Sequence, residues 1–260
     1  MQFRPQHLFN SADSELWPTW LLRARRNADA RALATARWVI RDREGAYRAT
    51  IDDRGEIRSL PPMQRVRTTN EWLTLIARAS RRDPVHALPM HGLERRLFEL
   101  GLDADAYSQR TGLTTIPEPS RLTLAGFDRY RRPLWLSEGA GRAWNRMRGV
   151  ASIDGVALDA ISGYRSHAYQ MGIFARKRAR GLEVDEILAV NAAPGFSEHH
   201  SGNALDIGTE GEPPAEESFE RTAAFRWLSD HAGDFGFHLS YPRDNPHGIV
   251  YEPWHWRWHA

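Results

Sequence analysis

Two residues that could bind a metal ion, His199 and Asp206, lie in one short segment, PGFSEHHSGNALDI, residues 194–207. Imidazole nitrogens and carboxylate oxygens are donors that first-row metals accept, and a catalytic zinc ion commonly takes three protein ligands and a water. The third ligand must therefore come from elsewhere in the chain. The C-terminal segment YEPWHWRW supplies His255 and, three residues before it, Glu252. Together these residues predict a metal-dependent hydrolytic site.

The local sequence predicts how the first two ligands are presented. Gly202 and the strand-forming tail ALDI argue against one continuous helix through His199 and Asp206. We expect a loop at His199, a turn at Gly202, and then a strand in which Ala204 and Asp206 share one face. A carboxylate between two aliphatic residues of a core strand is costly to bury unless it is paired or binds a metal.

The spacing of Glu252 and His255 needs an irregular backbone. Residues three apart in a regular strand point to opposite faces, but Pro253 lacks an N–H group and marks a bulge or a strand start. Both side chains can then face one pocket, with His255 as the third metal ligand and Glu252 as the general base toward a water. Arg165, in the polar loop after the apolar strand VALDAI, would supply positive charge for an oxyanion or an anionic end of a substrate.

The elements around these residues predict an α+β fold, with a small antiparallel sheet flanked by helices and with Asp206 and His255 on neighbouring strands. Composition changes at residues 115–119, where two prolines flank Glu118. We therefore predict an N-terminal region of mixed helices and strands and unknown role, residues 1–116, and a domain carrying the site, residues 117–260. Patterning further predicts helical spacing in 1–35, a strand meander in 37–58, helices at 70–80, 93–100, 137–148, 169–180, 184–190 and 219–231, a hairpin in 153–161, and a strand pair in 237–241 and 249–258.

The composition excludes several classes of protein. Hydrophobic residues make up 41% and charged residues 26% of the 260 residues, as in ordinary globular proteins. Since there is no cysteine, a metal must be bound by histidine and carboxylate. Residues 1–115 carry 19 basic and 14 acidic side chains and residues 116–260 carry 16 and 19, without a basic run interleaved with aromatics, so we expect no nucleic-acid partner.

Four motifs resemble those of the zinc D-Ala-D-Ala carboxypeptidases and dipeptidases of the vancomycin-resistance type. These enzymes belong to a wider group that also includes the lysostaphin-type endopeptidases and the hedgehog signalling domain. They are SGYRS with Gln170 behind it, SEHHSGNALDI matching S-x-H-x-x-G-x-A-x-D, FGFHLSYP, and YEPWHWR matching E-x-x-H. The resemblance covers residues 120–258. It implies one zinc ion per chain, bound by His199, Asp206 and His255. It also implies that Glu252 is the catalytic base and that Arg165 is a cation that steadies the scissile carbonyl or the tetrahedral intermediate.

The resemblance also implies substrate contacts. Ser197 and Tyr241 match positions that hold the terminal carboxylate of the substrate, and Gln170 is a further candidate. Relatives often have Arg-Tyr-Pro where this chain has Ser240 before Tyr241, so one cationic contact is missing from this segment. His200 is expected to point away from the metal.

The implied function is a zinc metallopeptidase that removes terminal D-Ala from peptidoglycan stem peptides. An L,D-carboxypeptidase or a D,D-dipeptidase or endopeptidase shares the same chemistry, and a zinc-stabilised binding module without turnover is a further alternative, against which Glu252 and Arg165 argue. The expected partner is a stem peptide; the sequence sets no oligomeric state. No stretch approaches the ~20 apolar residues of a membrane span, and no secretory signal is visible. The substrate class indicates the periplasm or cell envelope, with the cytoplasm as the alternative.

Overall fold

The computed structural model describes residues 4–24, 27–60, 68–81 and 83–260. Its contacts divide the chain into two units, Met1–Pro89 with Pro119–Thr123, and Met90–Glu118 with Leu124–Ala260. The structure thus groups residues 90–116, which we had assigned to the N-terminal region, with the unit that carries the predicted site. The reason is packing, since Leu93 and Leu97 share a hydrophobic core with Phe174 and Phe196.

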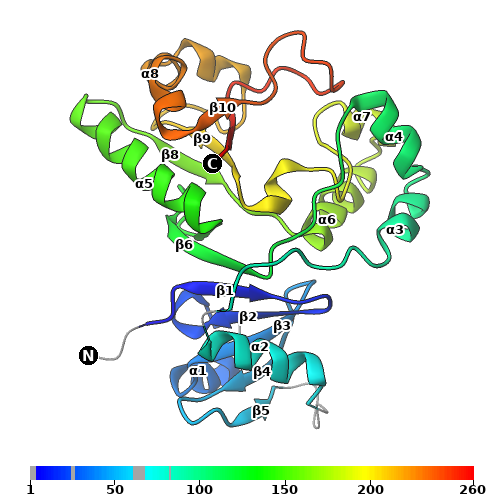
Figure 1. Cartoon of the computed structure of the whole chain (residues 1–260), viewed down its shortest axis with the longest axis vertical. Helices are drawn as coiled ribbons and strands as arrows, with labels where there is room; N and C mark the ends of the chain where they lie inside the picture. Colours follow the sequence, from blue (N-terminus) through cyan, green and yellow to red (C-terminus); the bar gives the residue numbers. More distant parts are fainter. Residues whose placement is uncertain (1–3, 25–26, 61–67, 82) are drawn as a thin grey trace. The chain divides into compact units, whose positions relative to one another are not determined.

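The first unit is built on an antiparallel sheet with the strand order β5-β4-β3-β2-β1, followed by the first residues of β6. Helix α2 packs on β1 and β2, and Trp72 of this helix donates a hydrogen bond from Nε1 to Ser14 Oγ at 3.1 Å. The elements are β1 (His7–Asn10), β2 (Ser14–Pro18), η1 (Thr19–Leu21), α1 (Asn27–Ala34), β3 (Trp38–Asp42), β4 (Tyr47–Ile51), β5 (Ile57–Ser59), α2 (Asn70–Ser80) and β6 (Arg121–Phe127) (Figure 1).

The meander predicted for residues 37–58 is confirmed. Its two turns end at Gly45 and Gly55, whose φ angles of 89° and 83° lie in the region that favours glycine. The helical spacing expected in residues 1–35 is correct only for α1, because residues 7–10 and 14–18 are strands. Their side chains alternate between the core and the other face of the sheet, and Phe9 and Leu16 enter the core with Ile40.

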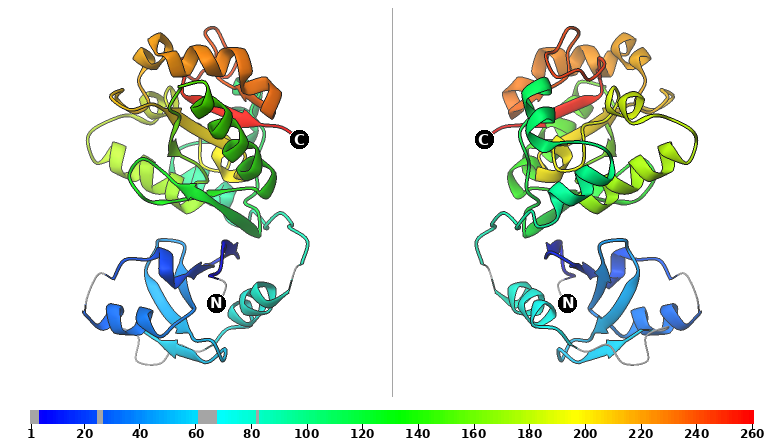
Figure 2. Two further views of the ribbon diagram at one scale, coloured as in Figure 1. Left: turned by 90° about the vertical axis from the view of Figure 1, so that its left-hand side faces the viewer. Right: turned by 90° about the vertical axis from the view of Figure 1, so that its right-hand side faces the viewer.

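The second unit contains a four-stranded antiparallel sheet with the order β10-β11-β9-β8. Helices α5 and α6 lie on opposite sides of this sheet (Figures 1 and 2). The α+β class is therefore confirmed. In this unit, α3 (Leu93–Glu99) and α4 (Ala104–Thr111) precede β6 in the chain. The elements that follow β6 are β7 (Pro133–Leu136), α5 (Glu138–Ile153), β8 (Asp159–Ser162), α6 (His167–Arg178), α7 (Val184–Leu188), η2 (Glu198–Ser201), β9 (Ala204–Gly208), η3 (Glu217–Arg221), α8 (Ala223–His231), η4 (Ala232–Phe235), β10 (Phe237–Leu239) and β11 (His255–Trp258).

The two faces of this sheet have different roles. Leu205 and Ile207 of β9 and Trp256 of β11 enter a core with α5 and α8, in which Trp144 is fully buried. Because side chains alternate along a strand, Asp206 and His255 belong to the opposite face. The antiparallel register pairs these two residues directly, which confirms that neighbouring strands carry them.

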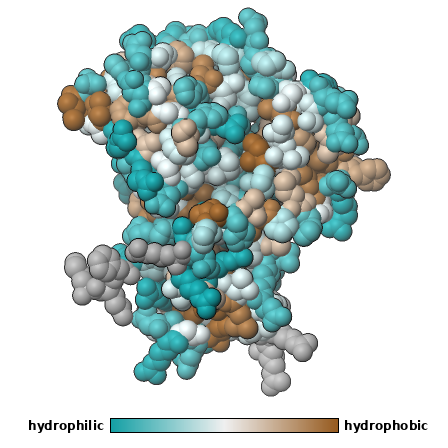
Figure 3. Space-filling view, viewed as in Figure 1, coloured by the Kyte–Doolittle hydropathy of each residue, from teal (hydrophilic) through white to brown (hydrophobic). Residues whose placement is uncertain are grey.

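Two local predictions in this unit were wrong. Residues 153–161 do not form a hairpin, because α5 continues to Ile153 and is capped by Asp154, and Gly155, with a φ of 76°, turns the chain away from the helix. Hydrophobic side chains at this end of α5 remain on the surface, where Figure 3 shows hydrophobic colour and Ile153 is 84% exposed. Residues 249–254 are also irregular, and β11 begins only at His255.

Candidate active site

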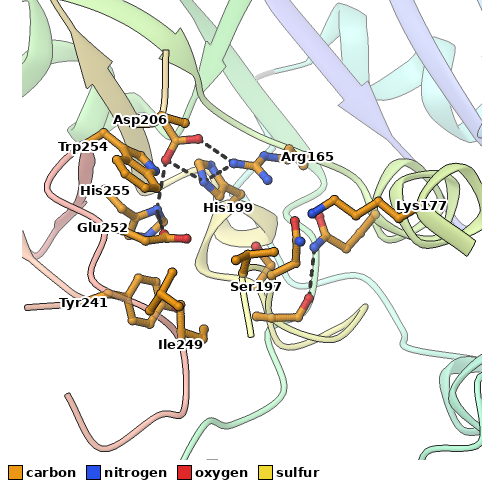
Figure 4. Close-up of a pocket in the computed structure, with 16 residues that line it drawn as sticks. Arg165, Lys177, Ser197, His199, Asp206, Tyr241, Ile249, Glu252, Trp254 and His255 are labelled. Atoms are coloured by element: carbon orange, nitrogen blue, oxygen red, sulfur yellow. Dashed lines mark hydrogen bonds and ion pairs between the residues drawn. The ribbon is translucent and has the colours of Figure 1, made fainter. Parts of the chain in front are cut away.

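A pocket of about 290 Å³ in the second unit is lined by all of the residues predicted to bind metal, catalyse or bind substrate (Figure 4). These residues come from five places in the chain. Arg165 precedes α6, Gln170 lies in α6, Ser197 and His199 lie at η2, Asp206 lies in β9, and Tyr241, Glu252 and His255 lie after β10 and at the start of β11.

The three predicted ligands converge on one point. Ligand atoms of His199, Asp206 and His255 all lie within 4.8 Å of one another, and all three residues are buried. Asp206 Oδ1 is 3.3 Å from His199 Nε2 and 3.0 Å from His255 Nδ1. In a tetrahedral zinc site with bonds of ~2.0–2.2 Å, ligand atoms are roughly 3.3–3.6 Å apart. The donor set and its spacing therefore fit a zinc ion after small side-chain adjustments.

Hydrogen bonds on the outer sides of both imidazoles determine which nitrogen faces the site. His199 Nδ1 donates to the carbonyl oxygen of Gly163 at 2.7 Å, so Nε2 is the nitrogen with a lone pair toward the centre. His255 Nε2 lies 2.9 Å from Glu198 Oε2 and donates to it, so Nδ1 faces the centre. Such outer contacts orient the ligands and increase their basicity in metal sites.

The electrostatics of the three ligands are strongly coupled. Burial lowers the pKa of His199 to about 4, with the Arg165 charge acting in the same direction. Burial alone would raise the pKa of Asp206, but His199 and Arg165 hold it well below its usual value. For His255, the hydrogen bonds to Asp206 and Glu198 outweigh burial and raise the pKa to about 10. A metal at Nδ1 must therefore displace a proton, which makes metal binding stronger at higher pH.

Glu252, the predicted general base, lines the pocket and has a raised pKa. A turn closed by the His255 N–H bond to the Glu252 carbonyl, at 3.1 Å, places both side chains at the pocket, as Pro253 had predicted. Glu252 Oε2 lies 3.9 Å from His255 Nδ1, beside the ligands. Burial raises the pKa of Glu252 to about 7, although the His255 charge opposes this effect. A base of this pKa exchanges protons readily near neutral pH.

Arg165 reaches the same centre from the loop after β8. Its Nη2 lies 2.6 Å from Asp206 Oδ2 and 2.6 Å from His199 Nε2, and its Nε donates to Ser162 Oγ at 3.1 Å. Ser166 caps α6 by accepting a hydrogen bond from the Tyr169 N–H, which fixes the end of this loop. The guanidinium group therefore places a fixed positive charge at the edge of the ligand cluster.

The three residues predicted to contact substrate lie on the pocket wall. Tyr241 is buried, its ring centroid is 4.9 Å from that of His255, and burial raises its pKa, so its hydroxyl stays a hydrogen-bond donor. Gln170 donates from Nε2 to the Ala192 carbonyl at 3.0 Å, while its buried Oε1 has no hydrogen-bond partner among the described residues. Ser197 is buried beside them.

Sequence patterns did not single out Glu198 as part of the site. Its two carboxylate oxygens bind His255 and Arg257, at 2.9 and 2.8 Å. Burial would raise its pKa, but the hydrogen bond and the charge of His255 lower it to about 2. Its place between Ser197 and His199 was the only available signal, because its partners are almost sixty residues away in the chain.

His200 points away from the metal ligands, as expected, but it is not a surface residue. Its Nδ1 donates to the Arg165 carbonyl at 2.7 Å, and its Nε2 accepts from the Gly195 N–H at 3.0 Å. Burial lowers its pKa well below the usual value, so the ring is neutral. His200 therefore ties the loop that carries His199 to the loop that carries Arg165.

Comparison with known proteins agrees with this arrangement. Residues 133–260 match the family VanY, D-alanyl-D-alanine carboxypeptidase. This part of the chain is similar to the VanY family. The match begins at β7 and includes every residue of the candidate site.

Individual curated proteins are similar to this chain over part of their length. YodJ of Bacillus subtilis (strain 168), named as a carboxypeptidase, is 35% identical over 149 residues, which cover 54% of this chain and 54% of YodJ. The D-alanyl-D-alanine carboxypeptidase of Enterococcus faecium is 35% identical over 38% of this chain and 32% of its own length. The chain thus spans about half the length, or less, of these curated relatives.

Among solved structures, the LdcB LD-carboxypeptidase is similar with 35% identity and a TM-score of 0.44, covering 48% of this chain and 59% of LdcB.

Proposed function

We propose that the VanY-like domain is a zinc-dependent D-alanyl-D-alanine carboxypeptidase that removes the terminal D-Ala from peptidoglycan stem peptides and binds one zinc ion per chain. The observation that carries this proposal is the convergence of the His199, Asp206 and His255 ligand atoms within 4.8 Å, in a pocket that Glu252 also lines. A site that only stabilises the fold would use a fourth protein ligand instead of a pocket with a base.

Zinc, where it binds, would polarise the scissile carbonyl and make the attacking water more acidic. The residues of the chain perform the remaining steps. Glu252 accepts the proton of the attacking water and then passes it to the nitrogen of the leaving D-Ala, for which a pKa near 7 is suited. Arg165 stabilises the negative charge that develops on the carbonyl oxygen. Ser197, Tyr241 and Gln170 position the end of the peptide.

The names of relatives support the reaction class. The family and a relative from Enterococcus faecium are D-alanyl-D-alanine carboxypeptidases, and YodJ is named as a carboxypeptidase. A peptidoglycan substrate would place the protein in the periplasm or cell envelope. Among the described residues, no helix has the length and apolar character that crossing a membrane requires.

The test is to incubate the zinc-loaded protein with a stem pentapeptide ending in D-Ala-D-Ala and to follow D-Ala release by mass spectrometry. A tetrapeptide ending in an L-residue and D-Ala distinguishes D,D from L,D cleavage. Glu252→Gln should retain zinc and lose about 10²- to 10⁴-fold in turnover, because it removes only the general base. Tight peptide binding by the wild type without release of any product would refute the proposal and favour a binding module.

A further inference from the structure

Lys177 is the only lysine in the chain, and it lies on the pocket wall. It follows Gln170 by seven residues on α6, which is two helical turns, so both side chains project from the same helix face. Figure 4 shows Lys177 extending from α6 into the pocket, on the side opposite Glu252 and Tyr241.

The stability of α6 does not require the positive charge of Lys177. A positive charge in the last turn of a helix is favourable, but Arg176 and Arg178 provide it in the same turn. Both arginines are exposed and neither lines the pocket, whereas Lys177 is partly buried. The inward direction of Lys177 therefore requires another explanation.

The ammonium group of Lys177 has no fixed counterion in the described part of the chain, where no ion pair or hydrogen bond involves it. Burial lowers its pKa, and the nearby Arg165 adds to this effect while Glu252 opposes it. Arg165, the arginine that lines the pocket, is bound to Asp206 at 2.6 Å. A partly buried cation without a partner is unfavourable, and an anionic group entering the pocket would relieve that cost.

The substrate of a carboxypeptidase brings such a group. Its free carboxylate lies one residue beyond the scissile bond, a distance of about 3.3–3.6 Å along an extended chain. The unpartnered Gln170 Oε1 on the same helix face shows that this wall has unused polar capacity. The residue before Tyr241 is Ser240, which is neutral and hydrogen-bonded to Glu198, so that segment supplies no cation.

We propose that Lys177 binds the free carboxylate of the C-terminal residue of the substrate and thereby selects carboxypeptidase over endopeptidase cleavage. This inference rests on the proposed function, which it deepens by naming the residue that recognises the chain end.

The experiment compares an acyl-D-Ala-D-Ala peptide with its C-terminal amide, using zinc-loaded protein. Lys177→Met should lower kcat/KM for the free acid about 10- to 100-fold, mainly through a higher KM, because an ion-paired hydrogen bond of this kind is lost in ground and transition states alike. Its kcat/KM for the amide should remain nearly unchanged. Lys177→Arg should retain most of the preference for the acid.

Two matched controls remove a positive charge from the same helical turn. Arg176→Met and Arg178→Met change the net charge of the protein as Lys177→Met does, but at exposed positions outside the pocket. Both should keep the acid-to-amide ratio of the wild type. A ratio that falls equally in all three variants would overturn the proposal, since it would reflect only the general field of the helix.

A binding measurement keeps the proposal testable without turnover. In the Glu252→Gln background, calorimetry should show that Lys177→Met weakens binding of the D-Ala-D-Ala dipeptide about 10- to 100-fold but not of its amide. An unchanged acid-to-amide ratio in Lys177→Met, in either assay, refutes the role of Lys177 while leaving the proposed function intact. If the wild-type protein releases no D-Ala, the proposed function is refuted. The calorimetric comparison of the dipeptide with its amide then still tests whether Lys177 binds the carboxylate.

A second source of carboxylate is tested separately. Two peptides that both end in free D-Ala-D-Ala, with and without an additional side-chain carboxylate on the acyl side, are compared in wild type and Lys177→Met. If the substitution removes a preference for the acyl-side carboxylate and leaves the acid-to-amide ratio unchanged, the assignment to the chain end is wrong.

Discussion

Replacing Glu252 by glutamine is expected to stabilise the metal-free protein at neutral and alkaline pH, although it removes the predicted catalytic base. Burial raises the pKa of Glu252 from 4.5 to about 7. Glutamine has nearly the same shape but carries no charge, so the substitution isolates the free energy of ionising this carboxyl group in the folded state.

The sign follows from proton binding. An acid with a raised folded-state pKa holds its proton more tightly in the folded than in the unfolded chain, so its stability contribution is fully present below pH 4.5 and is lost as the pH rises through 7. Each pKa unit is worth about 1.4 kcal/mol. The change in pKa from 4.5 to about 7 therefore makes the ionised wild type less stable by at most about 3.5 kcal/mol above pH 7.

The assay is urea unfolding of both proteins with a chelator present, followed by circular dichroism at pH 5 and pH 8. We expect Glu252→Gln to be more stable by up to about 3.5 kcal/mol at pH 8 and by less than about 1 kcal/mol at pH 5. Glu210→Gln removes a carboxylate from an exposed position and is the control. Added zinc should reduce the difference, because a nearby cation favours the ionised carboxylate.

The reasoning is refuted if Glu252→Gln and wild type differ equally at pH 5 and pH 8. It is also refuted if the variant is the less stable protein at pH 8, since Glu252 would then be stabilised as a carboxylate by its surroundings.

Two further substitutions test the metal site, and a third tests the backbone packing at Gly163. Asp206→Ala should lose stoichiometric zinc in elemental analysis, in contrast to Glu252→Gln, because only Asp206 supplies a ligand atom; equal zinc in both variants would contradict the ligand set. Glu198→Ala should weaken zinc binding about 10- to 100-fold in competition with a chelator, since His255 loses its outer hydrogen bond; unchanged affinity would show that this contact is dispensable. Gly163→Ala should lower the free energy of unfolding by about 1–3 kcal/mol, because its Cβ would lie 2.9 Å from the Trp135 carbonyl oxygen; a thermal melt without change would mean that the backbone accommodates it.

Local sequence determined the parts of the site that depend on residue type and near neighbours. The donor chemistry of His199 and Asp206, the turn at Gly202 and the strand that follows it all lie within one short segment. The alternation of ALDI was sufficient to separate Asp206 from the aliphatic residues that enter the core. Helix starts with a clear cap, at Thr69 and Ser137, were predictable for the same reason, because the capping side chain binds an N–H group three residues away.

Tertiary structure decided which distant groups complete the site. Glu198 reaches His255 and Arg257 only because β9 and β11 pair in one register, and no local pattern encodes that register. The assignment of residues 90–116 to the second unit likewise depends on packing of Leu93 and Leu97 against residues far along the chain. From the sequence alone, Lys177 is one of three basic residues in the last turn of a helix. It lines the pocket only because α6 packs beside the pocket, since the elements around a helix determine what each of its faces contacts.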